Sequence, residues 1–201
     1  MKIILGSSSA GRKLIMNELA QKFIFDFEVM SPDINEKAIR SDSPSDLVMA
    51  IANAKADVLV SKIKEPAILI CSDQVVLYGG KIREKPVDEM EAREFLQSYK
   101  TVHPETLGAV VIVNTKTGKR ASGLQKSKVY FKPLPKKIID EHIETGMSLR
   151  GAGGFVINDP ILKDYIDHIE GGFDSASGLS KELVKRLIVE VGGSLSLKSL
   201  K

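Results

Sequence analysis

The alternation of apolar and polar positions along the chain predicts strands and helices in turn. Apolar runs predict buried strands at residues 2–5, 67–71 and 75–78. Residues 23–30 alternate between apolar and polar side chains, as a half-buried strand does. Residues 11–21 show mixed helical spacing. Strand-like and helix-like segments alternate at first and strands then cluster, which predicts a mixed α/β fold with a mixed β-sheet.

Capping signals locate further helices. Ser43, Pro44 and Asp46 form a helix start, because Ser43 can cap, proline suits the first helical position and Asp46 completes a capping box. Residues 151–177 are rich in glycine and are expected to be irregular. The other predicted segments are helices at residues 44–62, 88–99, 138–144 and 181–191 and strands at residues 107–114 and 127–131.

Length and composition fit one globular domain without a membrane span. The 201 residues are enough for a single domain over 1–201, or for one domain with a cleft between two lobes, and a frayed tail is expected at 192–201. No apolar run approaches the roughly 20 residues that cross a bilayer, and the N-terminus lacks a signal-peptide pattern, so no membrane partner is expected. The single cysteine, Cys71, forms no internal disulfide and fits a reducing, cytoplasmic compartment.

The charge balance argues against nucleic acid as a partner. The 29 Lys and Arg residues are spread among 26 Asp and Glu residues, whereas a nucleic-acid-binding module needs a clustered basic face. The formal net charge of +3 is too small to support such a partner by itself. The chain has no Trp, so an aromatic surface for stacking single strands is not evident.

The stretch LGSSSAGRK, at residues 5–13, combines hydroxyl groups, glycine and positive charge between a strand and a helix. Free backbone N–H groups and the helix dipole favour an anion at such a helix start. Ser7 and Ser8 could add hydroxyl donors, and Arg12 could add a charge-assisted contact, which suits phosphate. The GxxxxGK[ST] spacing of a P-loop is absent, and a capped helix start in a polar turn explains the same residues equally well.

Four charged residues are candidates for phosphate or metal chemistry. Asp73 follows an apolar run, at a strand end where ligands bind in α/β sheets; it could ligate Mg²⁺, accept a proton from water, or be a turn residue. Lys55 lies on an apolar helix face and either snorkels to solvent or points into a cleft. Glu36 lies in a charged loop that could be merely solvated. Lys85 precedes Pro86, which favours an extended backbone in what could be only a basic turn.

Other kinds of catalytic site find no support. The three histidines show no pattern of a Ser-His-Asp arrangement, and the GxSxG elbow is absent. One cysteine with scattered histidines argues against a zinc site. By contrast, two lysines and an arginine could balance a polyphosphate, and two carboxylates could hold a divalent cation.

The order and spacing of seven short motifs resemble the Maf family. The motifs are LGSSSAGRK, DINEKAIR, AKA, SDQVV, REKP, AGGFVI and GLSKELV, and the resemblance covers essentially residues 3–190. Members of that family are nucleoside triphosphate pyrophosphatases, related in fold to the inosine triphosphate pyrophosphatases. The resemblance therefore implies an elongated mixed β-sheet flanked by helices, with a deep cleft between two lobes, often as a homodimer. The variant of the motifs looks more like the eukaryotic Maf-like branch than the common bacterial one.

The resemblance also implies a reaction. A nucleoside triphosphate is hydrolysed between its α- and β-phosphates to the monophosphate and pyrophosphate, with Mg²⁺ or Mn²⁺ as the divalent cation. Asp73 matches the acidic residue that is treated as the proton acceptor. Other charged positions of the family's active site are matched by Glu36, Lys55 and Lys85, and its phosphate loop is matched by Ser7 and Arg12.

Departures from the family pattern bear on the base of the nucleotide. The usual bacterial loop reads SxSPRR, and here Gly11 replaces one arginine. Gln74 follows Asp73 where the dTTP/UTP group has threonine, and a glutamine there resembles the members that prefer 7-methyl-GTP. Asn158 stands near a position where Gln or Glu is usual. Ser180 replaces the proline of the usual GLP motif. Gln74 and Asn158 are therefore candidate substrate-binding residues, and the preferred base stays open.

Together these features predict a pyrophosphatase that cleans pyrimidine or modified nucleotides from the nucleotide pool. Asp73 and Glu36 would hold or neighbour the metal, and Asp73 would also orient or deprotonate the attacking water. Lys55, Lys85 and Arg12 would offset charge on phosphate oxygens. The motif departures motivate an alternative, a catalytically weak nucleotide-binding or regulatory protein, which would bind nucleotides without turnover.

Overall fold

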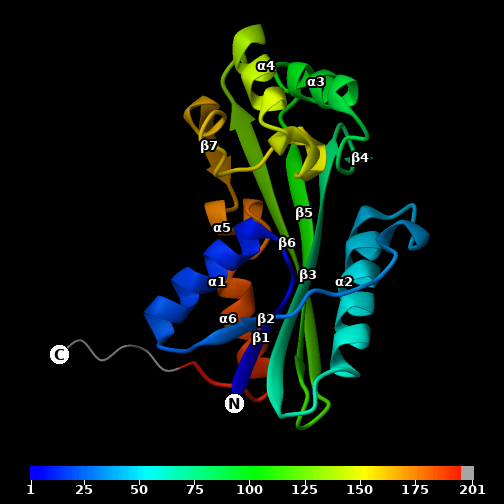
Figure 1. Cartoon of the computed structure of the whole chain (residues 1–201), viewed down its shortest axis with the longest axis vertical. Helices are drawn as coiled ribbons and strands as arrows, with labels where there is room; N and C mark the ends of the chain where they lie inside the picture. Colours follow the sequence, from blue (N-terminus) through cyan, green and yellow to red (C-terminus); the bar gives the residue numbers. More distant parts are fainter. Residues whose placement is uncertain (196–201) are drawn as a thin grey trace, which may run out of the picture. The chain divides into compact units, whose positions relative to one another are not determined.

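The computed structural model describes residues 1–195, which form a mixed sheet with helices beside it (Figure 1). The strands are β1 (Lys2–Gly6), β2 (Phe27–Val29), β3 (Ala67–Tyr78), β4 (Lys81–Arg83), β5 (Glu105–Asn114), β6 (Arg120–Phe131) and β7 (Ile166–Glu170). The α-helices are α1 (Ala10–Phe23), α2 (Pro44–Val60), α3 (Glu89–Ser98), α4 (Lys136–Glu144), α5 (Phe173–Ala176) and α6 (Lys181–Glu190). Short 3₁₀ turns are η1 (Glu36–Ala38), η2 (Met147–Leu149), η3 (Ala152–Gly154) and η4 (Lys163–Tyr165).

The strand order in the sheet is β2-β1-β3-β5-β6-β7, and β4 pairs with β3. β1 is parallel to both β2 and β3, whereas the β3–β4 and β6–β7 pairs are antiparallel. The predicted mixed α/β fold with a mixed sheet is therefore confirmed.

The described chain divides into two compact units. Unit one consists of residues 1–73, 108–125 and the chain from 178 onward, and unit two consists of residues 74–107 and 126–177. Strands β3, β5 and β6 contribute residues to both units. Of the frayed tail predicted at 192–201, residues 196–201 lie outside the described part.

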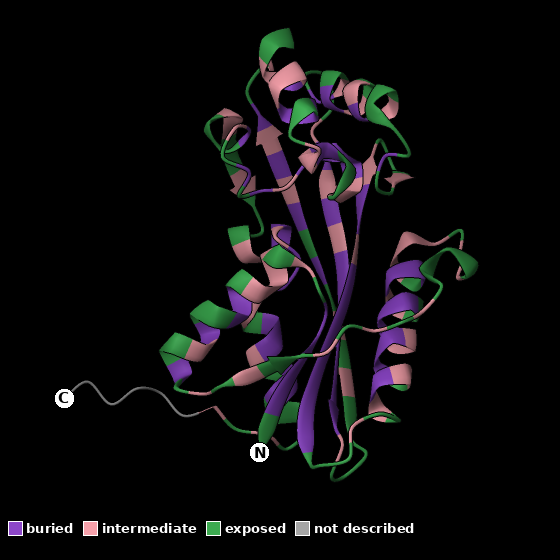
Figure 2. Ribbon diagram, in the orientation of Figure 1, coloured by how far each residue is buried: buried purple, intermediate pink, exposed green. Residues whose placement is uncertain are grey.

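Unit one packs its strands between helices. α1 and α6 lie on one side of β1 and the first half of β3, and α2 lies on the other (Figure 1). Ile3 and Leu5 face the α1–α6 side, because successive strand side chains point to opposite faces. β1 from Ile3 onward and the first half of β3 are accordingly buried (Figure 2), whereas β2 is partly exposed. The helices contribute Ile15, Met16 and Leu19 from α1 and Leu183, Val184 and Leu187 from α6.

Unit two has a separate core with an aromatic centre. The ring of Tyr99 stacks on Phe131 at a centroid distance of 5.7 Å, and Phe155 meets both rings edge-on at 5.7 and 5.2 Å. Such tilted and offset arrangements are the favoured ones for aromatic pairs. The buried Tyr99 hydroxyl donates a hydrogen bond of 2.6 Å to the Gly153 carbonyl, so its polar end is satisfied.

The predicted helices are confirmed to within about two residues at each end. The N-caps are confirmed, because a side-chain oxygen accepts a hydrogen bond from the backbone N–H three residues later at Ser43, Asp88 and Ser180. The Ser43 N–H donates to Ser41 Oγ at 3.2 Å, so the predicted reciprocal bond from Asp46 is not formed. The first helix, α1, is two residues longer at its C-terminal end than the spacing predicted.

Several strand predictions are wrong. β3 runs without interruption through residues 72–74, where a break was predicted. The strand predicted at 23–30 is only β2, because α1 extends to Phe23 and Ile24 then turns the chain with a φ of 47°. β6 begins at residue 120 instead of 127, and the segment predicted as irregular contains β7 and α5. Pairing with neighbouring strands outweighs the weak local preference of these residues.

Candidate active site

The loop after β1 is organised around Ser7 and Ser9. Ser9 caps α1, since its Oγ accepts from the Arg12 backbone N–H at 3.5 Å. The buried Ser7 Oγ accepts from the Ser9 N–H and from Nη1 of Arg12, both at 3.2 Å. Ser8 is exposed at the tip of the loop. The loop therefore presents a helix N-terminus, hydroxyl groups and a guanidinium together, which is an arrangement suited to an anion.

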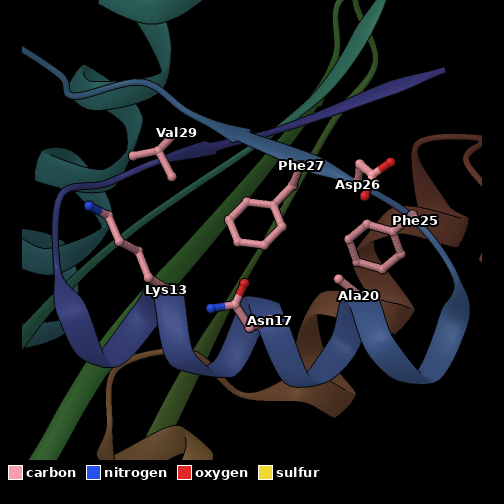
Figure 3. A pocket seen from close by; sticks show the side chains of 7 residues that line it. All are labelled: Lys13, Asn17, Ala20, Phe25, Asp26, Phe27 and Val29. Carbon is pink, nitrogen blue, oxygen red and sulfur yellow. The ribbon is translucent and has the colours of Figure 1, made fainter.

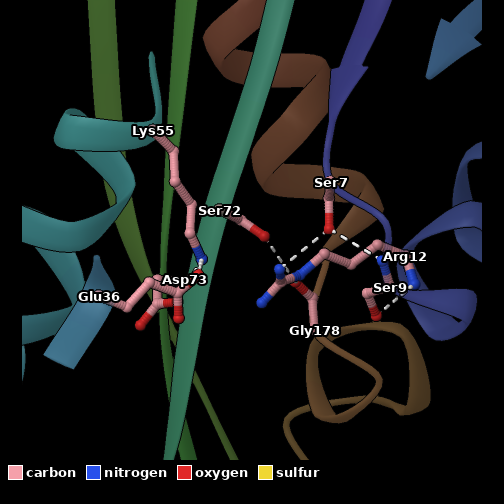
Figure 4. Close-up of polar contacts among 8 residues, drawn as sticks. All are labelled: Ser7, Ser9, Arg12, Glu36, Lys55, Ser72, Asp73 and Gly178. Atoms are coloured by element: carbon pink, nitrogen blue, oxygen red, sulfur yellow. Dashed lines mark hydrogen bonds and ion pairs between the residues drawn. The ribbon is translucent and has the colours of Figure 1, made fainter. Parts of the chain in front are cut away.

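Arg12 is oriented by a backbone carbonyl far along the chain. Its Nε donates to the Gly178 carbonyl at 3.3 Å, and the Ser72 hydroxyl donates to the same oxygen at 3.2 Å (Figure 4). Burial of the guanidinium lowers the Arg12 pKa below its ordinary value, and the negative charges of Asp73 and Glu36 partly offset that shift. An arginine remains protonated under such a shift, so the loop keeps its positive charge.

Lys55, Asp73 and Glu36 form a three-residue ion cluster. The Nζ of Lys55 lies 2.7 Å from Oδ1 of Asp73 and 2.9 Å from Oε1 of Glu36 (Figure 4). Lys55 is 4% exposed and Asp73 is 7% exposed, whereas Glu36 is exposed. Of the two predicted fates of Lys55, snorkelling is excluded: the apolar face of α2 carries the ammonium inward, where the two carboxylates pair with it.

β3 positions Asp73 through its partner strand. β1 ends at Gly6, which is paired with Cys71, so residues 72 and 73 of β3 lie just beyond the carboxyl end of that parallel neighbour. The prediction that Asp73 ends its own strand is wrong, because β3 continues to Tyr78. Asp73 nevertheless lies beside the point where the neighbouring strand β1 ends, which is where ligands bind in α/β sheets. Ser72 and Asp73 point to opposite faces of β3, Ser72 toward Gly178 and Asp73 toward Lys55 (Figure 4).

A glycine is required at the end of β1 because of close packing. A Cβ atom at Gly6 would lie 2.4 Å from Sγ of Cys71 and 2.7 Å from Cδ1 of Leu59. The glycine of the LGSSS stretch therefore lets β1 approach β3 and α2 before the chain enters the loop of residues 7–9. Burial also raises the pKa of the Cys71 thiol to about 12, so this thiol stays protonated.

The carboxylates fit a hard divalent cation only if the substrate supplies further ligands. Among residues 1–195, no three or more His, Cys, Asp or Glu side chains gather to hold a metal. Mg²⁺ is commonly bound through one or two carboxylates together with substrate phosphates and water. Asp73 and Glu36 offer such a pair, because the Lys55 contact goes to one oxygen of each carboxylate. The donor set therefore fits Mg²⁺ or Mn²⁺ bound with a polyphosphate.

The other predicted site residues lie in unit two. Lys85 and Asn158 are exposed, and their backbone segments are joined because the Gly153 N–H donates to the Glu84 carbonyl at 2.9 Å. Gln74 donates through Nε2 to the Ala176 carbonyl at 3.1 Å. Its Oε1 is buried without a hydrogen-bond partner among the described residues.

The sequence did not indicate that Ser72 and Gly178 take part in the hydrogen bonds around Arg12. Strand alternation could have indicated Ser72 only if β3 had been predicted to continue through residues 72–74, because Ser72 then faces the side opposite to Asp73. Gly178 takes part through its backbone carbonyl, and no side-chain pattern indicates that role.

A shallow hollow of about 330 Å³ lies between α1 and β2 (Figure 3). Phe25 and Phe27 line it together with Lys13, Asn17 and Asp26. It contains none of the predicted site residues, so the hollow is separate from the ion cluster.

The comparisons identify the family. The Maf family, described as Maf-like protein, matches residues 2–191, and the chain belongs to this family. The 7-methyl-GTP pyrophosphatase of Dictyostelium discoideum is 40% identical over 196 residues, covering 94% of this chain and 96% of that protein. The dTTP/UTP pyrophosphatase of Bdellovibrio bacteriovorus is 30% identical over 190 residues, covering 92% and 96%.

Among solved structures, the Staphylococcus aureus Ham1 protein is 13% identical with a TM-score of 0.41, covering 66% of this chain and 73% of that one. The predicted family is confirmed by the match over residues 2–191. No helix in the described part of the chain is long and apolar enough to cross a membrane.

Proposed function

We propose that this protein is a nucleoside triphosphate pyrophosphatase, which releases pyrophosphate and leaves the nucleoside monophosphate. Membership of the Maf family and the pyrophosphatase names of relatives that span nearly the whole chain support this activity. The observation that carries the mechanism is the Lys55–Asp73–Glu36 cluster beside the open end of β1, in which Lys55 and Asp73 are buried and Glu36 is exposed. The cluster brings two carboxylates, which can ligate a metal ion through oxygen, next to the ammonium group of Lys55.

Each predicted site residue in unit one has a proposed role. Asp73 orients the attacking water and accepts its proton, and Lys55 and Arg12 offset charge on phosphate oxygens. Ser7 and Ser8 donate hydrogen bonds to phosphate at the start of α1. Asp73 and Glu36 would also hold Mg²⁺ or Mn²⁺, which would supply neutralisation of phosphate charge.

The tasks proposed for unit two rest on the resemblance to the family. Lys85 would contact phosphate, and Gln74 and Asn158 would contact the base. Two amides suit a nucleobase edge, because each amide offers both a donor and an acceptor. The 40% identity to a 7-methyl-GTP pyrophosphatase makes 7-methyl-GTP the first nucleotide to test.

The first experiment measures pyrophosphate release with Mg²⁺ or Mn²⁺ across dTTP, UTP, CTP, GTP and 7-methyl-GTP. Asp73→Asn should lower kcat by about 10²–10⁴-fold, the usual range for losing a general base. Asp57→Asn is the matched control, because Asp57 is exposed on α2 and pairs with Arg120 away from the cluster; its turnover should stay at the wild-type level.

The outcomes separate activity from binding. Wild-type turnover in Asp73→Asn would show that the role of Asp73 is wrong. Nucleotide binding without turnover by the wild-type protein would favour the alternative of a catalytically weak binding or regulatory protein.

Two properties of the protein in the cell belong to the same proposal. The single cysteine, which is buried, agrees with a reducing cytoplasmic compartment. A homodimer follows from the family resemblance, and light scattering of the purified protein would show a monomer mass if it is wrong.

A further inference from the structure

Unit two contains a buried pair of ionisable side chains that the proposed chemistry does not use. His142 of α4 is fully buried, and Asp159 is 1% exposed. Burying two such groups is costly unless their hydrogen bonds are satisfied. Their partners therefore indicate what the pair holds in place.

His142 contacts both ends of the segment 154–159, the Gly154 carbonyl at its start and the Asp159 carboxylate at its end. The Nε2 of His142 lies 2.9 Å from the Gly154 carbonyl oxygen, which can only accept, so Nε2 carries a hydrogen. The Nδ1 of His142 lies 3.4 Å from Oδ2 of Asp159, and neither of these two buried atoms makes a hydrogen bond among the described residues. This contact is attractive only with a proton on one of the two atoms. Oδ1 of Asp159 accepts the backbone N–H groups of Ile161 and Leu162, both at 2.9 Å.

The segment 154–159 has one exposed polar side chain, that of Asn158. Phe155 and Ile157 are 5% and 4% exposed and pack in the aromatic core of unit two. Asn158 is exposed. The residue that the proposed function assigns to the base is thus directly next to Asp159, on a backbone whose neighbours face inward.

Gly153, the residue directly before this segment, is hydrogen-bonded to the backbone that carries Lys85. Gly153 donates its N–H to the Glu84 carbonyl at 2.9 Å and accepts from the Tyr99 hydroxyl at 2.6 Å. Gly153 has a φ of 68°, and a Cβ there would lie 2.7 Å from the Tyr99 oxygen, so this junction admits only glycine. Hydrogen bonds on both sides therefore leave the segment little freedom.

We propose that His142 and Asp159 are positioning residues that fix the direction of Asn158 for reading the base of the nucleotide. This inference rests on the proposed function. An amide distinguishes bases only when its donor and acceptor are aimed at matching groups, because hydrogen bonds weaken steeply with misalignment. Removing the contacts of His142 with Gly154 and Asp159 should lower discrimination between bases and leave the phosphate chemistry of unit one intact.

The test compares four proteins: wild type, His142→Gln, Asn158→Ala and the double variant. The measured quantity is the ratio of kcat/KM for the two best nucleotides of the panel. Each single change should lower this ratio about five- to tenfold, the value of one hydrogen bond. The loss should be in KM, with kcat for the best nucleotide within about twofold of wild type.

The double variant shows whether His142 acts through Asn158. If it does, His142→Gln changes the ratio no further in the Asn158→Ala background. Asp159→Asn is the conservative rescue: its amide can donate to Nδ1 while its carbonyl still accepts from residues 161 and 162, so the ratio should stay at the wild-type value. Asp159→Ser, which is too short to reach Nδ1, replaces His142→Gln if that variant does not fold.

Three results would overturn the inference. In the first, His142→Gln lowers the melting temperature but leaves the ratio unchanged, which makes the pair merely structural. In the second, the two losses multiply in the double variant, so His142 acts independently of Asn158. In the third, the wild-type protein turns over no nucleotide, and the proposed function then fails together with the inference.

Discussion

Replacing Lys55 with methionine would test how strongly the ion cluster depends on its buried cation. Methionine keeps an unbranched apolar side chain on α2 but removes the ammonium that lies 2.7 Å from Asp73. Asp73, 7% exposed, would then lose its buried partner. Removing one partner of a buried ion pair costs about 3–5 kcal/mol.

Glu36 adds little to that magnitude. Its side chain is 51% exposed, so water can replace Lys55 as its partner, and a pair of this kind contributes at most about 1 kcal/mol. Glu36→Gln is therefore the matched control and should lower stability by less than about 1 kcal/mol. For a chain of this length, the Lys55→Met cost corresponds to a fall in melting temperature of roughly 6–20 °C.

The assay is urea unfolding followed by far-ultraviolet circular dichroism, because the chain has no tryptophan for fluorescence. Tyrosine fluorescence serves as the second probe, and coincident transitions would justify a single free energy of unfolding. The double variant Lys55→Met/Asp73→Asn should recover most of the lost stability, since neither charge then remains in the interior. A Lys55→Met loss below about 1 kcal/mol, or a double variant no more stable than the single one, would refute the reasoning.

Two further predictions concern the packing behind the loop. Gly6→Ala should cost about 1–3 kcal/mol, because its Cβ would meet Cys71 and Leu59, and Cys71→Ala in the same chain should recover part of that loss; strictly additive losses in thermal unfolding would contradict the contact. Cys71 should resist iodoacetamide at pH 8, because a thiol with a pKa of about 12 forms almost no thiolate at pH 8. It should react after unfolding in urea, where the thiol is no longer buried. Equal alkylation of folded and unfolded protein by mass spectrometry would exclude this environment.

Local signals in the sequence were enough for the longer α-helices, whereas the four-residue α5 was not predicted. Ser43, Asp88 and Ser180 each accept a hydrogen bond from an N–H only three residues away, so their effect is contained in a few adjacent residues. The strands were harder, because a strand is stabilised by partners distant in sequence. The polar residues 72–74 read as a turn, yet β3 continues through them, since Ser72 and Asp73 find partners from Gly178 and Lys55.

For the candidate site too, the sequence indicated some features and the tertiary structure decided the others. The sequence alone named Asp73, Lys55 and Glu36 as candidates, but it left open whether Lys55 would snorkel to solvent. Tertiary structure decided that question by bringing two carboxylates against a lysine on an apolar helix face.

Contacts over long separations lay beyond what sequence patterns could reach. Arg12 and Gly178 are 166 residues apart, and the contact uses a backbone carbonyl that every residue type possesses. His142 and Asp159 carried no pattern either, because their pairing depends on how α4 packs against the segment that follows it. Residue types and their local spacing determined the helices and the chemical candidates, whereas the long-range packing of strands and helices decided which of those candidates meet.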